Sequence, residues 1–223
     1  MHEAMRTRFP KEKNKIHFVP NGIEEYATKT VRNRTSTSTD TLKLITVGSL
    51  IERKGHKQIL NAVNSINTSN NRVSITLTIV GDGPLKKTLI DHCHALDIEQ
   101  YVHFLGHVPH EKIQDQLHNA DAFILASYSE GRPNVVIEAM GAALPIVASR
   151  ISGNLELIQH GHNGLLFIND DNDDLCRQIM KLAESIGIRE RLGTSARKKI
   201  FDDNISWQRT ANEYFHIFKE CIL

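Results

Sequence analysis

The stretch Ser127-Tyr-Ser-Glu-Gly-Arg-Pro-Asn-Val-Val-Ile-Glu-Ala-Met-Gly141 decides the fold that we predict for this chain. It follows the apolar run Ala122–Ala126, which has the composition of a strand buried on both faces of a parallel sheet. From Asn134 to Ala143 apolar residues recur at helical spacing, so a helix follows the strand. Gly131 and Pro133 lie in the turn, where glycine permits close backbone approach and proline is tolerated at a helix start. Such a strand–turn–helix junction directs free N–H groups and the positive end of a helix dipole at one point, which suits a phosphate.

Two carboxylates flank this point. Glu130 lies in the turn at the carboxyl end of the strand, and Glu138 lies about one turn into the helix, near the same crevice. A single glutamate on a helix is usually a solvated surface group. The residues around Glu138 are apolar, however, and an unpaired charge in a buried helix is costly. We therefore expect a partner for Glu138, and a ligand hydroxyl is one candidate.

Strand and helix patterns alternate along the rest of the chain. The expected strands are Leu42–Gly48, Val73–Val80, Val102–Leu105, Ala122–Ala126, Pro145–Ser149 and Gly164–Ile168. The expected helices are His56–Ile66, Pro84–Leu96, Glu111–Asn119, Asn134–Ala143, Asn154–Ile158, Asp173–Ser185, Arg189–Ile200 and Ser206–Cys221. This order predicts an α/β fold, a doubly wound parallel sheet of about six strands with right-handed crossovers. Ligands of such sheets bind beyond the carboxyl ends of the strands, where glycine-bearing turns collect here.

Composition narrows the function class. The net charge of +1 gives no reason to expect nucleic acid binding. Residues 1–34 carry eight Lys/Arg against four Asp/Glu, which could touch anionic lipid, although a flexible solvated end is the interpretation we favour. Three widely spaced cysteines indicate a reduced compartment, and no apolar run approaches a membrane span. We expect a cytoplasmic protein, with the inner face of the membrane as an alternative.

The N-terminal forty residues differ from the remainder. Ile16–Val19 has a short strand pattern that stops at the turn signal Pro20-Asn21-Gly22, and residues 33–40 are too polar to pack. A compact domain is therefore expected only from about residue 41 onward.

Further motifs follow the first two strands of this domain. Val47–Gly55 contains Arg53 and Lys54 just before a helix start, where two cations can meet a diphosphate, although such a pair is more often solvated. Gly81-Asp82-Gly83-Pro84 resembles half of a dinucleotide-binding fingerprint, but Lys86 replaces the third glycine. A nicotinamide or flavin cofactor is therefore not expected, and no G-x-x-x-x-G-K-S/T phosphate loop is present.

Two other clusters resemble metal sites. The run Asp170–Asp174 lacks the glycine and the terminal glutamate of a calcium loop, and we interpret it as acids at a helix start. His92-Cys93-His94 has no second ligand pair at a suitable spacing, so a structural role is expected. We predict no metal site and no nucleophilic serine or cysteine.

Five ordered motifs together give a family resemblance. They are Pro20-Asn21-Gly22, Val47–Leu50 with Arg53–Gly55, Val80–Pro84, Phe104–Gly106 and Ser129–Met140. The chain resembles the carboxyl-terminal half of retaining glycosyltransferases of the GT-B architecture, the glycosyl transferases group 1 or family-four type. The Glu-x7-Glu signature of Glu130 and Glu138 is the most specific of these motifs.

The resemblance implies a role for each matching position. Glu130 would lie against the donor sugar, Glu138 would hold the ribose hydroxyls, and Lys54, with Arg53, would face the donor diphosphate. The residues implied in donor binding by their turns are Gly48, Ser49, Gly81, Gly83, Pro84, Phe104, Leu105, Gly106, Gly131, Arg132, Pro133, Asn134 and Val135. Many relatives carry arginine where this chain has Ser49, and Arg53 is the candidate to compensate. The family implies a nucleotide-sugar donor, UDP-linked first and GDP- or ADP-linked as alternatives, and no cofactor or bound metal.

Enzymes of this type have a second domain that carries the acceptor site. By the resemblance, residues 1–40 correspond to the tail of that domain plus a linker, and residues 41–223 to the donor-binding domain with a closing helix at 206–221. Three hypotheses follow. The chain is a piece of a complete hexosyltransferase, or a natural donor-binding subunit that works with a separate acceptor chain, or a nucleotide-sugar-binding module or epimerase-like protein without transfer activity.

Overall fold

A six-stranded parallel sheet forms the centre of the computed structural model, which describes Met5 and residues 7–12, 15–17, 19–23, 41–69 and 72–222. The strand order is β3-β2-β1-β4-β5-β6. The strands are β1 (Thr41–Val47), β2 (Ser74–Val80), β3 (Val102–Gly106), β4 (Ala122–Leu125), β5 (Ile146–Ser149) and β6 (Leu165–Phe167). Every neighbouring pair runs parallel, so the predicted doubly wound α/β fold is confirmed.

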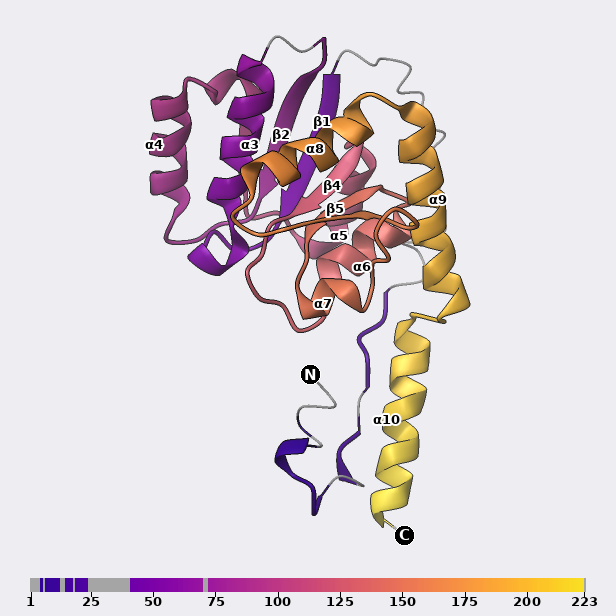
Figure 1. Cartoon of the computed structure of the whole chain (residues 1–223). Helices are drawn as coiled ribbons and strands as arrows, with labels where there is room; N and C mark the ends of the chain where they lie inside the picture. Colours follow the sequence, from indigo (N-terminus) through magenta and orange to yellow (C-terminus); the bar gives the residue numbers. More distant parts are fainter. Residues whose placement is uncertain are drawn as a thin grey trace.

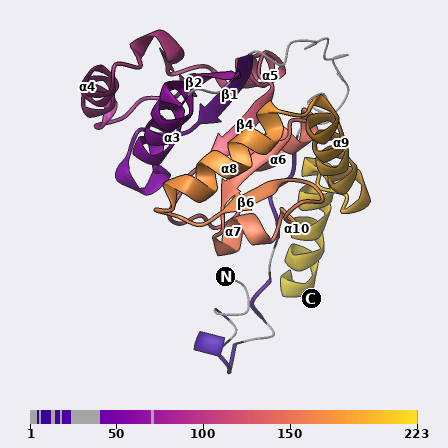
Figure 2. The ribbon, with the colours of Figure 1, turned by 45° about the horizontal axis from the view of Figure 1, so that its top comes forward.

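Helices cover both faces of this sheet (Figures 1 and 2). One face carries α3 (His56–Thr68), α4 (Lys86–Leu96) and α8 (Asn172–Ala183). The other carries α5 (His110–His118) and α6 (Asn134–Gly141), with α9 (Ile186–Asp202) packed beside α6. Among the described residues from 41 onward, the other helices are η2 (Glu52–Lys54), η3 (Glu99–Tyr101), α7 (Ser152–Leu155) and α10 (Trp207–Ile222).

The two apolar cores explain why the central strands are apolar on both faces. In β4, Ile124 packs into the core under α3 and α8, whereas Phe123 and Leu125 pack into the core under α5 and α6. All three side chains are buried. Each buried side chain of this size contributes about 1.5–3 kcal/mol from the hydrophobic effect, so a polar residue inside this run would destabilise the fold.

Three predicted helix starts and one predicted strand were wrong. The helix expected from Arg189 begins at Ile186, because the Ser185 side chain caps it by accepting a hydrogen bond from Ile188 N–H. The helix expected from Pro84 begins at Lys86, because the Leu85 N–H donates to the Leu50 carbonyl. Pro84 and Leu85 therefore form a turn beside the loop that follows β1. The helix expected at 154–158 is α7, which begins after Ile151, because the N–H of Asn154 already bonds to the Ile151 carbonyl. The described residues among 16–19 form no strand, and Phe18 lies outside the described residues.

The last helix projects from the body of the molecule (Figure 1). At its base Ile23 forms a parallel bridge with Ser206, so residues 19–23 pass beside the junction of α9 and α10. Along α10 the expected apolar side chains are exposed, namely Trp207, Tyr214, Phe215 and Phe218. Among the described residues, no helix is both long and apolar enough to cross a membrane.

Candidate functional site

The site lies where the strand order reverses. Strands β1 and β4 are neighbours at the middle of the sheet, and the chain winds outward from them in opposite directions. In doubly wound sheets this switch point leaves a crevice beyond the carboxyl ends of the two strands. The loop after β1 carries Gly48–Gly55 and the loop after β4 carries Ser127–Pro133. The Arg53-Lys54 loop and the first glutamate of the Glu-x7-Glu signature therefore meet beyond the carboxyl ends of these two strands.

Glu130 is the centre of the charged cluster in this crevice. Its carboxylate accepts a hydrogen bond from Lys54 Nζ at 2.6 Å, and Arg53 NH1 approaches it at 3.3 Å. Ser127 Oγ donates a third hydrogen bond, at 2.8 Å. The Glu130 side chain is 10% exposed and that of Lys54 15%, whereas Arg53 is 49% exposed. The structure thus brings together the three residues for which the family resemblance implied a role at the sugar and diphosphate.

These contacts determine the charge state of Glu130. Burial by itself raises the pKa of a carboxyl group, but hydrogen bonds from Lys54 and Ser127 and the charges of Lys54 and Arg53 outweigh it. The pKa of Glu130 is lowered as a result. Glu130 is therefore an ionised carboxylate at neutral pH, held against two cations.

Gly55 is the residue that lets η2 carry the two cations to Glu130. It has a positive φ of 65° and links η2 to α3. A Cβ atom at this position would lie 2.1 Å from the Ala126 carbonyl oxygen, so the loop after β1 touches the end of β4 directly. Hydrogen bonds then join the loops: Tyr128 N–H donates to Arg53 O, and Arg53 NH1 donates to Ser129 O at 2.7 Å.

A chain of buried hydrogen bonds connects Glu130 to Ser149 and Asn154, and the sequence did not reveal it. Ser127, Ser149 and Asn154 are all fully buried. Ser149 Oγ donates to the Ser127 carbonyl at 2.6 Å, and Asn154 Nδ2 donates to the Ser149 carbonyl at 2.8 Å. Gly153 permits this packing, because a Cβ there would lie 2.4 Å from Gly131 O. The available signal was a serine at the carboxyl end of each of two apolar strands, Ser127 just beyond β4 and Ser149 as the last residue of β5.

Glu138 occupies a different part of the site from Glu130. On α6 its side chain is only 17% exposed, and His110 Nδ1 lies 4.0 Å from its carboxylate. Burial raises the pKa of Glu138, and the charge of His110 offsets only part of this effect. In the described part of the chain its carboxylate makes no hydrogen bond and does not contact Glu130. Glu138 is thus a mostly buried acid without a close partner among the described residues, and its role toward a ligand hydroxyl stays a prediction.

Glycine turns hold the loops after β1 and β2 against each other. A Cβ on Gly81, whose φ is 137°, would lie 2.0 Å from Gly48 O, and one on Gly83 would lie 2.6 Å from Leu50 O. The neighbouring residues Ser49 and Pro84 are exposed. The Gly81-Asp82-Gly83-Pro84 motif thus allows the loops after β1 and β2 to pack closely. This packing needs the glycines whether or not a dinucleotide binds.

The residues predicted to form a base pocket lie beside these turns. Gly81 N–H donates to Gly106 O at 2.8 Å, which places the end of β3 against the loop after β2. Leu105 is 46% exposed and Phe104 is half-buried. The ion pair of Lys86 with Asp82, at 2.9 Å, lies next to Gly106, since a Cβ there would meet both side chains within 4 Å. The structure therefore brings these predicted positions together at one edge of the sheet.

The remaining predicted donor-binding residues form the turn before α6. Pro133 is buried and precedes the first helical residue, Asn134. The side chains of Arg132 and Asn134 turn toward Asn21 of the N-terminal segment. Gly131 is exposed, and Val135 packs partly into the core under α5 and α6. The backbone of this turn faces the crevice end of β4, whereas two of its side chains are already engaged.

The two clusters with metal-like composition have structural partners. Asp171 caps α8 by accepting a hydrogen bond from Asp174 N–H at 2.8 Å, which confirms the interpretation of acids at a helix start. His92 bonds to Asn61 and His94 to Glu99, and Cys93 is buried in the core. Among the described residues, no group of three or more His, Cys, Asp or Glu side chains is arranged to hold a metal ion.

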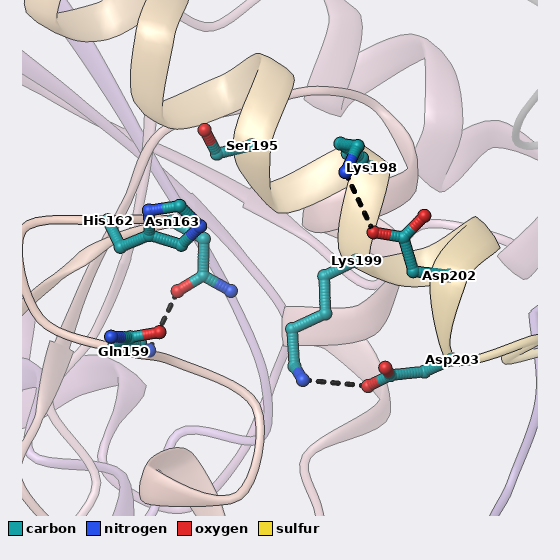
Figure 3. A pocket seen from close by; sticks show the side chains of 8 residues that line it. All are labelled: Gln159, His162, Asn163, Ser195, Lys198, Lys199, Asp202 and Asp203. Carbon is teal, nitrogen blue, oxygen red and sulfur yellow. Dashed lines mark hydrogen bonds and ion pairs between the residues drawn. The ribbon is translucent and has the colours of Figure 1, made fainter.

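A separate cavity of about 270 Å³ lies between the end of α9 and the loop before β6 (Figure 3). Its two lysines are paired with aspartates on the same helix end, Lys198 with Asp202 and Lys199 with Asp203. It therefore presents no unpaired cation to a ligand and lies apart from Glu130, and it is not part of the candidate site.

Comparison with known proteins identifies the family. The sequence profile of the family described as "Glycosyl transferases group 1" matches residues 27–199. An uncharacterised glycosyltransferase of Methanocaldococcus jannaschii, MJ1607, is 28% identical over 180 residues, which cover 81% of this chain and 45% of that protein. The chain thus spans less than half the length of this curated relative.

Solved structures show the same fold. HepE of Anabaena, in complex with UDP and glucose, has a TM-score of 0.81 and 20% identity, over 98% of this chain and 61% of that one. TarM of S. aureus, in a complex that includes UDP, has a TM-score of 0.82 and 20% identity, over 97% of this chain and 42% of that one. The fold is the Rossmann-like fold of GT-B glycosyltransferases, and because the family profile matches most of the chain, this chain belongs to the glycosyl transferases group 1 family.

Proposed function

We propose that this chain is the donor-binding half of a hexosyltransferase that transfers a sugar from a nucleotide-diphosphate sugar to an acceptor, with retention of the anomeric configuration. The observation that carries the proposal is the cluster of Glu130, Lys54 and Arg53 at the switch point of the sheet. Family membership supports the reaction class.

The chemistry of transfer suits these residues. As the bond to the sugar breaks, the leaving nucleoside diphosphate gains negative charge, and fixed cations stabilise that charge. In this proposal Lys54 and Arg53 face the diphosphate, together with the unpaired N–H groups at the start of α6. Glu130 lies against the donor sugar, and its carboxylate keeps both cations in place before the donor binds.

Glu138 would bind the ribose. Its buried carboxylate can accept hydrogen bonds from two adjacent hydroxyl groups, which would supply the close partners that it lacks among the described residues. The loops at Gly81–Pro84 and Phe104–Gly106 would enclose the base.

UDP-sugars are the donors that we favour. Two structural neighbours with TM-scores above 0.8 are complexes that contain UDP, HepE and TarM. Because this chain spans only part of its relatives, we propose that an acceptor-binding domain or subunit completes the enzyme. We also propose that the reaction takes place in the cytoplasm, in keeping with the free thiols of Cys93 and Cys176, and at the inner face of the membrane if the acceptor is a lipid.

The test is calorimetric titration of the 223-residue chain with UDP, GDP and ADP, followed by an assay of UDP-sugar hydrolysis. We expect UDP to bind more tightly than the other two, and Glu130→Gln to abolish hydrolysis while UDP still binds. Tighter binding of GDP or ADP would correct the donor class. Absence of binding by all three nucleotides would overturn the proposal.

A further inference from the structure

Asn21 joins the N-terminal segment to the turn that follows Glu130. Its side-chain Nδ2 donates a hydrogen bond to Asn134 Oδ1 at 3.0 Å. Its backbone carbonyl accepts a hydrogen bond from Arg132 NH1, also at 3.0 Å. These two contacts flank buried Pro133, so one residue of a distant segment holds both sides of the turn.

The opposite side of this segment is anchored independently of the turn. Thr210 Oγ1, from the first turns of α10, donates to the Pro20 carbonyl at 2.7 Å. Ile23 is buried and bridges to Ser206. A Cβ on Gly22 would lie 2.0 Å from the Ser206 carbonyl carbon, so the two backbones are in direct contact. Asn21 therefore projects from a segment whose place is determined by the junction of α9 and α10.

Asn134 links the N-terminal segment to the candidate site. It is the first residue of α6, and the first intrahelical bonds run from Val136 and Ile137 back to Pro133. The N–H groups of Asn134 and Val135 thus have no partner within the helix and are the donors available to a phosphate. Because Asn21 binds the side-chain oxygen of Asn134, it also decides which way that amide group points.

We infer that Asn21 is a positioning residue of the donor site, which acts through Asn134 and holds the start of α6 at the orientation that a nucleoside diphosphate requires. The inference rests on the proposed function, since it assumes that this turn binds the donor. Asn21 itself does not touch the donor. Its effect must therefore disappear when Asn134 loses its amide.

The experiment is a double-mutant cycle with UDP as the probe, measured by calorimetry on the full chain. Asn21→Ala removes one neutral hydrogen bond, so we expect the Kd for UDP to rise by about three- to tenfold. In the Asn134→Ala background, Asn21→Ala is expected to change the Kd no further. Asn212→Ala is the matched control, because Asn212 is an exposed amide on α10 whose side chain also makes one hydrogen bond to another amide, accepting from Gln208 at 3.1 Å.

Two results would overturn the inference. In the first, Asn21→Ala binds UDP as tightly as Asn212→Ala. In the second, Asn21→Ala weakens binding equally with and without the Asn134 amide, which is the behaviour of a general loss of structure. The melting temperature and far-UV circular dichroism of Asn21→Ala, compared with those of Asn212→Ala, show whether the variant keeps its structure. If the unmutated chain does not bind UDP, the proposed function fails, which is a separate outcome.

Discussion

Lys54 Nζ lies 2.6 Å from Glu130 Oε1, although the two residues are 76 positions apart in the chain. The contact is possible because β1 and β4 are neighbours in the sheet, so the loops that follow them end at the same crevice. A cation held by a carboxylate in this way is already desolvated in part and oriented before a diphosphate arrives.

Replacing Lys54 tests its role toward the diphosphate. Lys54→Met retains most of the apolar stem but removes the charge, so we expect the Kd for UDP to rise by about ten- to a hundredfold, the value of a charge-assisted hydrogen bond. Lys57→Met is the matched control, because Lys57 is an exposed lysine on the adjacent turn of α3. Equal affinities of the two variants in calorimetry would exclude a role for Lys54 in UDP binding.

Replacing Ser127 tests which interactions keep the pKa of Glu130 low. The hydrogen bond from Ser127 is one of the interactions that lower this pKa, so Ser127→Ala should raise it. The acid limb of the pH profile of UDP-sugar hydrolysis then moves to higher pH, because Glu130 becomes protonated earlier. Ser127→Thr retains the hydroxyl and should restore the position of the limb. An acid limb that stays in place in Ser127→Ala would show that this hydrogen bond does not control the ionisation of Glu130.

Glu138 is expected to destabilise the free protein at neutral pH. Its folded-state pKa is raised by burial, so the ionised form is penalised above that pKa, and the penalty disappears as the pH falls through it. Glu138→Gln should therefore raise the melting temperature at neutral pH, with a difference that shrinks on acidification. The same variant should bind UDP more weakly if Glu138 holds the ribose. A variant no more stable than the unmutated chain at neutral pH would contradict the burial argument.

Replacing Gly55 and Gly161 by alanine separates two costs at η2, that of a positive φ and that of a close backbone contact. Both have positive φ, 65° and 77°, but a Cβ on Gly55 would collide with Ala126 O whereas one on Gly161 would meet nothing within 4 Å. Gly161→Ala should cost about 1 kcal/mol of unfolding free energy from the left-handed conformation alone. Gly55→Ala should cost about 3 kcal/mol or more, because the clash adds to that strain. Urea denaturation measures both, and equal losses would show that the close approach to β4 is relieved at no cost.

Much of the fold was predictable because local sequence patterns determine the strands and helices. Mostly apolar stretches of four to eight residues that alternate with amphipathic helices predicted the six parallel strands, since strands covered on both faces are predominantly apolar. Glu130, Lys54 and the glycine turns could be recognised as candidates because their loops follow those strands directly. The helix starts near Pro84, Asn154 and Arg189 were misplaced, because contacts with Leu50 and Ile151 and the cap formed by Ser185 decide them.

What the sequence determined by itself was the set of strands and helices and the residue types placed at the carboxyl edge of the sheet. Only the tertiary structure decided which loops meet: the reversal between β1 and β4, the buried support of Ser149 and Asn154, and the contact of Asn21 with Asn134. The physical reason is that apolar periodicity depends on neighbours within a few residues, whereas strand order and buried hydrogen bonds depend on the packing of the whole chain.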